Sequence, residues 1–424
     1  MHADKKRIAV VGSGISGLGA VHILKDAAQV TLFEKNTYLG GHSRTLEVEV
    51  DGQHVPVDTG FIVYNERNYP LLTALFNDLQ LPTVKSDMSF GVSIENGWLE
   101  YASNGLSGLF GSLRNLTSPG MWKLVRDILR FNRQAQAFMN ADPSVTLGML
   151  LDELRLGEWF RNYYLLPMGG SIWSCPTGQM LKFPAATFIR FFDNHGLLTV
   201  SDHPQWYSVL GGSKEYVQRL RNQWENSVET RPGATCVRRD DHGGVTVTDT
   251  SGREERFDEV ILASHPDESL RMVQSPTRRE TELLSAFRYQ PNEVILHTDE
   301  SFMPRRRSAW ASWVYQSSKR QDNAPAISLS YWMNNLQNLG TDVPIIVTLN
   351  PMREPAPDKI LDRHVFDHPV FDEKAIRAQG ELMEIQGADR IWYCGAWQRN
   401  GFHEDGQWSA VRVAAEMGVD VPWS

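Results

Sequence analysis

The sequence predicts an α/β fold, in which a doubly wound, Rossmann-like domain is interleaved with an α+β domain that carries an antiparallel sheet. Its 424 residues exceed what a single hydrophobic core usually holds, so two domains are expected. Residues 7–24 combine a short apolar run, a glycine-rich turn and a helical stretch, as in a parallel sheet covered by helices. Residues 287–385 alternate strand-like runs with Pro, Asn, Asp and Gly clusters, which favours an antiparallel sheet.

The first element is the apolar run at residues 7–11, which we expect to form a buried parallel strand. The turn that follows, GSGISG at residues 12–17, matches the GxGxxG pattern between a strand and a helix. Gly12 permits the tight turn, Gly14 lets a pyrophosphate approach the backbone, and Gly17 lets the helix pack against the strand. The first helical amides then face the phosphates, so this segment predicts a dinucleotide site.

The second strand, Val30–Phe33, ends in Glu34, 22 positions after Gly12. An acid at this distance is expected to accept a hydrogen bond from the adenosine ribose, and it disfavours a ribose with an extra phosphate. A second glycine turn follows in GGHSRT at residues 40–45, where we expect Arg44 to meet the pyrophosphate from the other side. Nicotinamide enzymes do not need this loop, so FAD is the predicted cofactor.

The strand at residues 57–61 ends in a small-residue turn, where backbone is expected to lie against a flat ring. With these motifs the chain resembles the flavin-containing amine oxidase superfamily, which includes carotenoid desaturases and protoporphyrinogen oxidases. It resembles more closely a group of bacterial amine-oxidase-like NAD/FAD-binding proteins, some of which occur with enzymes that methylate or cyclopropanate phospholipid acyl chains. The other segments that carry the resemblance are residues 210–213, 214–224, 235–238, 258–264, 391–397 and 401–410.

The resemblance implies that both ends of the chain contact the cofactor. It implies that the backbone of Val237 meets the adenine and that the final helix points its first amides at the flavin pyrimidine. The expected cofactor contacts are Gly12, Ser13, Gly14, Ile15, Ser16, Gly17, Glu34, Lys35, Gly41, His42, Ser43, Arg44, Thr59, Gly60, Phe61, Val237, Gly395, Gly406 and Gln407. The predicted FAD-binding domain comprises residues 1–80, 206–286 and 386–424, and the predicted substrate domain comprises residues 81–205 and 287–385.

Two residues near the start of the final helix are the predicted catalytic candidates. His403 and Glu404 fall beside the expected flavin edge, where a base would remove a substrate proton. A capping acid in a polar turn would produce the same sequence, so that alternative stays open. His364 and His368 lie near acids but lack a third soft ligand, so we expect no metal site.

Two features of the substrate domain bear on the substrate. Aromatic residues in its expected strands line an apolar tunnel or form ordinary core, namely Trp310, Trp313, Tyr315, Tyr331 and Trp332. Residues 106–139 contain five basic side chains against one acid, a net charge of +4, among apolar residues. The charged residues of this segment are Arg114, Lys123, Arg126, Arg130 and Arg133, with Asp127. The segment predicts either a basic amphipathic surface for an anionic membrane or a solvated helix face.

These features together predict an FAD-dependent oxidoreductase that dehydrogenates or desaturates an apolar substrate, such as a membrane-lipid fatty acyl chain. A soluble amine oxidase that releases peroxide, a flavin-dependent double-bond isomerase and a flavin-bearing scaffold remain alternatives. The sequence contains no second GxGxxG for NADPH, so electrons are expected to leave to oxygen or to a membrane acceptor.

Composition narrows the class further. A net charge of -9 argues against general nucleic-acid binding. No apolar stretch approaches the roughly 18 to 20 residues that a membrane-spanning helix needs. Cys175, Cys236 and Cys394 lack the spacing of a zinc site and are expected to be reduced thiols. We therefore expect a cytoplasmic protein with a small-molecule or lipid partner, which contacts the inner face of the membrane; its oligomeric state is not predicted.

Overall fold

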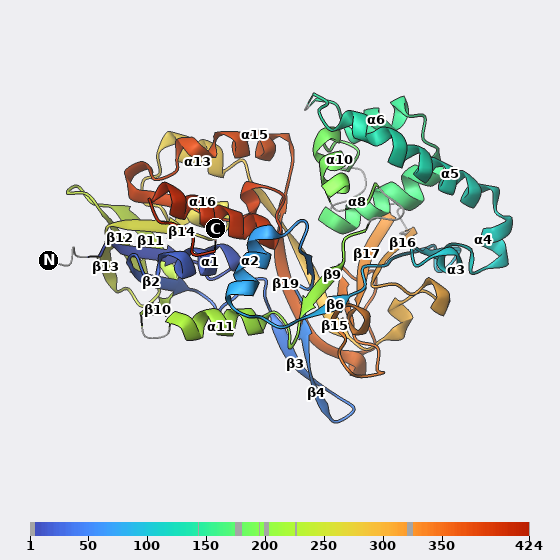
Figure 1. The fold of residues 1–424 in the computed structure, drawn as a ribbon, viewed down its shortest axis with the longest axis horizontal. Helices are drawn as coiled ribbons and strands as arrows, with labels where there is room; N and C mark the ends of the chain where they lie inside the picture. Colours follow the sequence, from blue (N-terminus) through green and yellow to red (C-terminus); the bar gives the residue numbers. More distant parts are fainter. Residues whose placement is uncertain are drawn as a thin grey trace.

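The computed structural model describes most of the chain and divides it between two large sheets. The described residues are 5–142, 144–173, 180–194, 196–198, 203–224, 227–319 and 325–423. Within them, a five-stranded sheet lies toward one end of the molecule, and a seven-stranded sheet with a cap of helices lies toward the other (Figure 1). The predicted α/β class is confirmed.

The five-stranded sheet is entirely parallel and has the order β10-β2-β1-β14-β20. Its strands are β1 (Arg7–Val11), β2 (Gln29–Glu34), β10 (Glu229–Pro232), β14 (Glu259–Leu262) and β20 (Ile391–Tyr393). The first two strands were predicted within a few residues. Strands from three distant parts of the chain thus share one sheet, as the predicted FAD-binding domain requires; the domain boundaries themselves stay a prediction.

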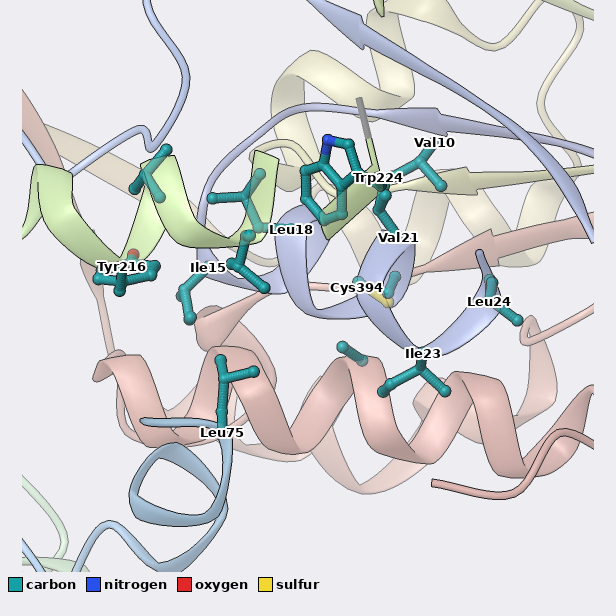
Figure 2. Close-up of a cluster of buried hydrophobic side chains, with 14 of the residues drawn as sticks. Val10, Ile15, Leu18, Val21, Ile23, Leu24, Leu75, Tyr216, Trp224 and Cys394 are labelled. Atoms are coloured by element: carbon teal, nitrogen blue, oxygen red, sulfur yellow. The ribbon is translucent and has the colours of Figure 1, made fainter. Parts of the chain in front are cut away.

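One face of the parallel sheet is covered by helix α1 (Ile15–Leu24), every residue of which is buried. A helix that is buried all round needs partners on several sides. Here they are α11 (Lys214–Trp224) and α16 (His403–Glu416), which flank α1, and α2 (Pro70–Asp78) (Figure 2). The N-terminal and C-terminal segments of the chain therefore pack directly on each other.

The opposite face is covered by a three-stranded antiparallel sheet together with helices. The sheet consists of β11 (Ala234–Arg239), β12 (Val245–Asp249) and β13 (Glu254–Phe257). The helices are α12 (Pro266–Met272), α13 (Arg278–Leu284) and α15 (Glu373–Glu381). Their apolar side chains share one core with the parallel sheet, so both faces of that sheet are buried.

The seven-stranded sheet has the order β19-β15-β18-β17-β16-β7-β8. Its strands are β7 (Phe90–Ile94), β8 (Leu99–Ala102), β15 (Arg288–His297), β16 (Trp313–Lys319), β17 (Pro325–Trp332), β18 (Ile346–Leu349) and β19 (Ile360–Val370). The antiparallel prediction is confirmed except at one place, because β16 pairs with β7 in parallel. Strand β16 begins at Trp313, after a 3₁₀ turn at Arg307–Ala309.

Helices cap the far end of this sheet (Figure 1). They include α3 (Leu106–Phe110), α4 (Leu113–Thr117), α5 (Pro119–Gln134), α6 (Leu147–Glu153), α8 (Leu166–Trp173) and α10 (Ala185–Asn194). Shorter strands join the two halves: the hairpin β3 (Thr45–Val50) and β4 (Gln53–Asp58), and the sheet of β5 (Tyr64–Asn65), β9 (Trp206–Val209) and β6 (Thr83–Ser86). No helix among the described residues is long and apolar enough to span a bilayer.

Two of the three cysteines lie in described segments. Cys236 and Cys394 are free thiols, and burial raises the pKa of Cys394 to about 12. Cys175 lies outside the described residues. The redox state of the thiols stays a prediction.

Candidate functional site

A cavity of about 860 Å³ runs from the parallel sheet to the seven-stranded sheet. Its walls come from the β1–α1 turn, the end of β2, the turns at residues 41–42 and 59–63, the start of α12, strand β19 and the start of α16. The seven-stranded sheet, α8 and α10 close the other end. Segments from the whole length of the chain thus meet around one space.

The β1–α1 turn is shaped by three glycines with different roles. Gly12 has φ of +103°, and a Cβ there would lie 2.7 Å from the Ala263 carbonyl oxygen. A Cβ on Gly17 would lie 1.8 Å from the Gly12 carbonyl oxygen, so this glycine lets α1 pack against the turn. A Cβ on Gly14 would meet nothing within 4 Å. Gly14 therefore faces open cavity, where a phosphate can approach the backbone.

The amides of α1 face the same space. The first intrahelical bond of α1 runs from the Leu18 amide to the Gly14 carbonyl at 2.9 Å, so the amides of residues 15–17 have no intrahelical acceptor. These amides stand at the positive end of the helix dipole and can hold an anion. Ser13, Ile15 and Ser16 line the cavity, and their contact with a cofactor stays a prediction.

Glu34 lies at the end of β2 and lines the cavity. Its Oε2 accepts hydrogen bonds from the Ser13 amide at 2.9 Å and the Ser13 hydroxyl at 2.5 Å. Its Oε1 accepts from the Asn36 amide at 2.7 Å. This carboxylate is fixed in place, and its free lone pairs can accept from a ribose hydroxyl. Lys35 also lines the cavity and forms an ion pair with Glu268.

The second glycine turn reaches the cavity through two of its four expected contacts. Gly41 and His42 line the cavity, whereas Arg44 does not. The Arg44 guanidinium instead donates to both carboxylate oxygens of Asp362, at 2.8 and 3.2 Å, and to the Thr59 hydroxyl at 3.2 Å. Arg44 was predicted to meet the pyrophosphate, but the structure engages it in an ion pair with β19.

The turn at residues 59–61 lies beside the start of α16. Thr59, Gly60 and Phe61 line the cavity, and the Phe61 ring stacks on His403 with centroids 3.7 Å apart. A Cβ on Gly60 would lie 2.1 Å from the His42 carbonyl oxygen, so only glycine allows this close approach. Ser43 sits behind the wall, where its hydroxyl contacts His403 Nε2 at 2.9 Å and the Tyr216 hydroxyl.

The two catalytic candidates are placed differently. His403 lines the cavity, and burial lowers its pKa to about 3, so the ring is neutral at physiological pH. Glu404 is not among the lining residues: its carboxylate accepts from the Leu71 and Leu72 amides, at 3.1 and 2.9 Å. Glu404 therefore caps α2, and burial raises its pKa. Glu404 thus acts as a capping acid, which was the alternative to a catalytic role. It lies on α16 but caps α2.

Four other predicted contacts lie behind the cavity wall. A Cβ on Gly406 would lie 2.6 Å from Ile15, and the Gln407 side chain packs against Gly19, so both residues join α16 to α1. Gly17 packs within its turn, as described above. Val237 is buried in β11, and its carbonyl accepts from the Gln274 amide at 2.8 Å. Residues 233–235, just before Val237, line the cavity instead, and Gly395 lines it too.

Several lining residues were not predicted as cofactor contacts. They are Ser264, His265, Glu268, Arg271, Tyr289, His364, Asp367 and His368. Pro266 follows His265 and marks a helix start, which is the local signal that could have indicated a site at this turn. His364 and His368 had been considered only as metal ligands. Among the described residues, no group of three His, Cys, Asp or Glu side chains is arranged to hold a metal ion.

The end of the cavity at the seven-stranded sheet is apolar, and we call it the apolar arm. It is lined by Met88 and Phe90 before and in β7, Met168 in α8, Phe191 in α10, and by Trp313 and Tyr331, whose strands pair them directly. The tunnel prediction thus holds for Trp313 and Tyr331. Trp310 and Trp332 instead pack edge to face in a separate core, and Tyr315 is buried under the helical cap.

The nucleotide end of the cavity fits FAD. Gly14 leaves room for a pyrophosphate, the α1 amides can bind it, and Glu34 can accept from the ribose. The first intrahelical bond of α16 runs from the Gly406 amide to the Phe402 carbonyl at 3.0 Å, so the amides of residues 403–405 have no intrahelical acceptor. Of these residues His403 lines the cavity, where the positive end of the α16 dipole can favour an electron-rich ring edge.

Comparisons with known proteins agree with this site. The profile of the family described as "Flavin containing amine oxidoreductase" matches residues 15–368. A probable zeta-carotene desaturase from Synechococcus elongatus is 26% identical over 209 residues, which span 45% of this chain and only 39% of that protein.

Solved structures share the fold over nearly the whole chain. A CLA-producing fatty acid isomerase from P. acnes superposes with a TM-score of 0.71 at 14% identity, over 99% of this chain and 100% of its own. The cyclohexylamine oxidase of Brevibacterium oxydans superposes with a TM-score of 0.70 at 15% identity, over 98% and 100%. At these identities the likeness shows the fold alone. The family match covers most of the chain, and the protein therefore belongs to the flavin-containing amine oxidoreductase family, whose members are enzymes that use FAD.

Proposed function

We propose that this flavin-dependent oxidoreductase dehydrogenates an apolar carbon chain, with the fatty acyl chain of a membrane lipid as its substrate. The observation that carries the proposal is the chemistry of the apolar arm. Apolar and aromatic side chains from the seven-stranded sheet face those of α8 and α10 across this space. Burial of a long alkyl chain against such surfaces is favourable in proportion to its area.

The charges of the cavity support the same substrate class. The charged lining residues among those described are Glu34, Lys35, Glu268, Arg271 and Asp367. All come from the end of β2, from α12 and from β19, at the nucleotide end. The described part of the apolar arm therefore offers no carboxylate to an ammonium group and no cation to a free carboxylate. A substrate whose polar head stays outside, such as an esterified acyl chain, suits this arm best.

The chemistry divides between the cofactor and the chain. When bound, FAD supplies the hydride acceptor. The aromatic pair Trp313 and Tyr331 orients the alkyl chain, and the apolar walls exclude water. Loss of a hydride leaves positive charge on carbon, and the neighbouring proton is then acidic enough for a weak base. His403 is such a base, since it lines the cavity with a pKa of about 3. Two electrons then pass to dioxygen or to a membrane acceptor.

We also infer contact with an anionic membrane through a surface on α4 and α5, here called the α4–α5 patch. Its exposed apolar residues are Leu113, Leu116, Trp122 and Leu129. Its basic residues are Arg114, Lys123, Arg126, Arg130 and Arg133. The only acid of the segment, Asp127, is buried and accepts from Arg126 and the Gly157 amide. The patch thus presents cations beside apolar side chains, as membrane-surface helices do.

The position of the α4–α5 patch fits lipid delivery. Helix α5 packs on the same helical layer that closes the apolar arm, with Phe131 of α5 against Phe192 of α10. The inner leaflet of a cell membrane carries anionic lipid, so we place the protein in the cytoplasm at that face. A lipid could then pass from the membrane to the arm through one layer of helices.

A second candidate is an amine oxidase, because the rings of Trp313 and Tyr331 lie 5.0 Å apart in the arm and an aromatic pair can hold a cation. Peroxide release with a panel of alkylamines and polyamines would support it. A double-bond isomerase is the third, and it would give a lipid product of unchanged mass.

The test of the lipid proposal is a single-turnover experiment. The purified holoprotein is mixed without oxygen with vesicles of phosphatidylglycerol that carry saturated or monounsaturated acyl chains. We expect the flavin absorbance to bleach and the acyl chains to lose two hydrogen atoms by mass spectrometry. Bleaching by amines but not by any vesicle would defeat the proposal, and a shifted double bond without bleaching would replace it with isomerisation.

The membrane contact is tested by co-sedimentation with the same vesicles. The variant K123E/R133E reverses two exposed charges of the α4–α5 patch, and R278E/K374E makes the same charge change on exposed residues of α13 and α15. Each basic residue near an anionic surface contributes about 1 kcal/mol, so the first variant should bind at least about 30-fold more weakly. Equal loss in both variants would show that only net charge matters.

A further inference from the structure

The second glycine turn brings an imidazole to the place where an arginine was expected. Gly41 has φ of +58°, and a Cβ there would lie 3.0 Å from Gly14 Cα. The two glycine turns therefore touch at the point where the backbone is open to a phosphate. His42 follows Gly41 and lines the cavity, whereas Arg44 is held by Asp362 on β19.

The fixed cations around this point are already paired. Lys35 forms an ion pair with Glu268, and Arg271 forms one with Asp267 at 2.9 Å. The cavity lining contains no other Lys or Arg among the described residues. The pyrophosphate of FAD carries two negative charges, and the amides of α1 supply only partial positive charge. A further full positive charge beside the pyrophosphate must therefore come from a group that takes up a proton.

His42 is suited to that uptake. Its ring lies among other imidazoles, with centroids 5.8 Å from His368 and 6.5 Å from His265, and it stacks on Phe366 at 4.7 Å. Burial and the neighbouring imidazoles, with that of His403 among them, hold the pKa of His42 well below its usual range. An adjacent dianion would reverse this balance, because it favours the charged form of the ring.

The neighbouring imidazoles are less free to take up the proton. His368 Nδ1 lies 3.0 Å from the Asn292 amide nitrogen, which also donates to the Gln290 carbonyl, while the Asn292 oxygen accepts from Asn350. The Asn292 amide is thereby oriented as a donor, so His368 Nδ1 must remain an acceptor and the ring neutral. No hydrogen bond fixes the His42 ring among the described residues.

The groups that act electrostatically on His42 are the imidazoles of His265, His364, His368 and His403. The titratable groups at the nucleotide end of the cavity, these imidazoles included, come from every surrounding element. They are Glu34 and Lys35 at the end of β2, Tyr38 in the turn, His265, Asp267, Glu268 and Arg271 at α12, Tyr289 on β15, His364, Asp367 and His368 on β19, and His403 on α16. Glu34 is matched by backbone donors, Glu268 by Lys35 and Asp267 by Arg271, whereas the exposed Asp367 forms no ion pair among the described residues. None of these acids is among the main groups that shift the pKa of His42, so the pyrophosphate is the new charge that the ring meets.

We propose that His42 takes up a proton when the pyrophosphate of FAD binds, so that the protein holds its cofactor more tightly at low pH than at high pH. Arg44 has no part in this contact. Linkage between proton and cofactor binding fixes the direction of the effect. If the FAD-bound protein carries the extra proton, the dissociation constant for FAD rises with pH by at most tenfold per pH unit. This rise occurs between the pKa of His42 in the free protein and its pKa in the bound protein. The protein would then release FAD as the medium becomes alkaline.

The first test dilutes the yellow holoprotein into buffers from pH 5.5 to 8.5 and measures released FAD by its fluorescence. We expect release to increase with pH. The variant His42→Gln should release FAD more readily at low pH and lose the pH dependence, whereas His42→Arg, with a permanent charge, should retain FAD at every pH. His54→Gln is the matched control, because it removes an exposed imidazole of β4 that does not line the cavity, and it should keep the wild-type pH dependence.

The second test counts protons directly. Apoprotein prepared at high pH is titrated with FAD, and separately with ADP-ribose, in two buffers of different ionisation enthalpy in a calorimeter. We expect uptake of up to one proton with either ligand, since both contain the pyrophosphate, and no uptake in His42→Gln. Zero uptake by wild type, unchanged uptake in His42→Gln, or an Arg44→Gln variant that loses FAD affinity as His42→Gln does would each overturn the proposal.

Discussion

The variant Gly14→Ala should separate cofactor binding from folding. A Cβ at this position meets nothing within 4 Å, and Gly14 has φ of -65°, which an alanine adopts without strain. Alanine is a poorer N-cap than glycine and costs about 0.5–1 kcal/mol there. Alanine also lowers the conformational entropy of the unfolded chain, which stabilises the folded protein by about 0.4–1 kcal/mol. The free energy of unfolding of the apoprotein should therefore change by less than about 0.5 kcal/mol.

The same methyl group occupies the space into which the pyrophosphate must come. Overpacking of a fitted site costs about 1–3 kcal/mol. The dissociation constant for FAD should therefore rise about 5-fold to 150-fold. Urea unfolding of the apoprotein and fluorescence titration with FAD measure the two quantities on one preparation.

Gly17→Ala is the matched comparison, because it adds the same methyl group three residues away. Its Cβ would lie 1.8 Å from the Gly12 carbonyl oxygen, so the turn must shift and the free energy of unfolding should drop by about 3 kcal/mol. The reasoning is refuted if Gly14→Ala binds FAD as wild type does, or if it destabilises the apoprotein as much as Gly17→Ala.

Three further predictions follow from single side chains. Glu404→Gln should lower the free energy of unfolding by about 1 kcal/mol through the weakened cap of α2, and leave the FAD affinity unchanged; a loss of affinity in the same titration would place Glu404 at the cofactor. Burial lowers the pKa of His297 from 6.5 to about 4, so between these values the unfolded chain binds a proton that the folded chain does not. The free energy of unfolding should therefore fall as the pH drops from 6.5 to 4, by at most about 1.4 kcal/mol per unit from this group, and His297→Gln should show a shallower slope in urea unfolding. Tyr331→Glu places an acid in the apolar arm opposite Trp313, so it should retain FAD but lower kcat/KM for acyl substrates at least about tenfold; unchanged turnover would mean that the substrate does not enter this arm.

The expected site residues that line the cavity lie mostly in short, contiguous motifs. The β1–α1 turn has its glycines, strand and helix within 18 residues, and local sterics alone decide its shape. The position of Glu34 is also set locally, because β2 pairs in parallel with β1 and its last residue therefore lies next to the β1–α1 turn. The family resemblance depended on the same local motifs, and the family match confirms it.

The expected contacts that do not line the cavity stand where neighbouring residues point in different directions. Arg44 and His42 are two positions apart, but the conformation at Gly41 turns His42 to the cavity and leaves Arg44 to pair with Asp362, far along the chain. His403 and Glu404 are adjacent on a helix, where successive side chains diverge by about 100°. Tyr331 and Trp332 likewise face opposite sides of a strand, so only one of them lines the apolar arm.

The sequence by itself determined the parallel sheet, the first phosphate turn, the helical final segment and the family, because each depends on local spacing and on apolar periodicity. Tertiary structure alone decided which side chains reach the cavity. His42, His265 and His368 come from three segments that carry no common motif, and they meet only because β19 and the start of α12 pack against the second glycine turn. Such contacts depend on how whole helices and strands pack against each other, and a local sequence pattern does not determine that packing.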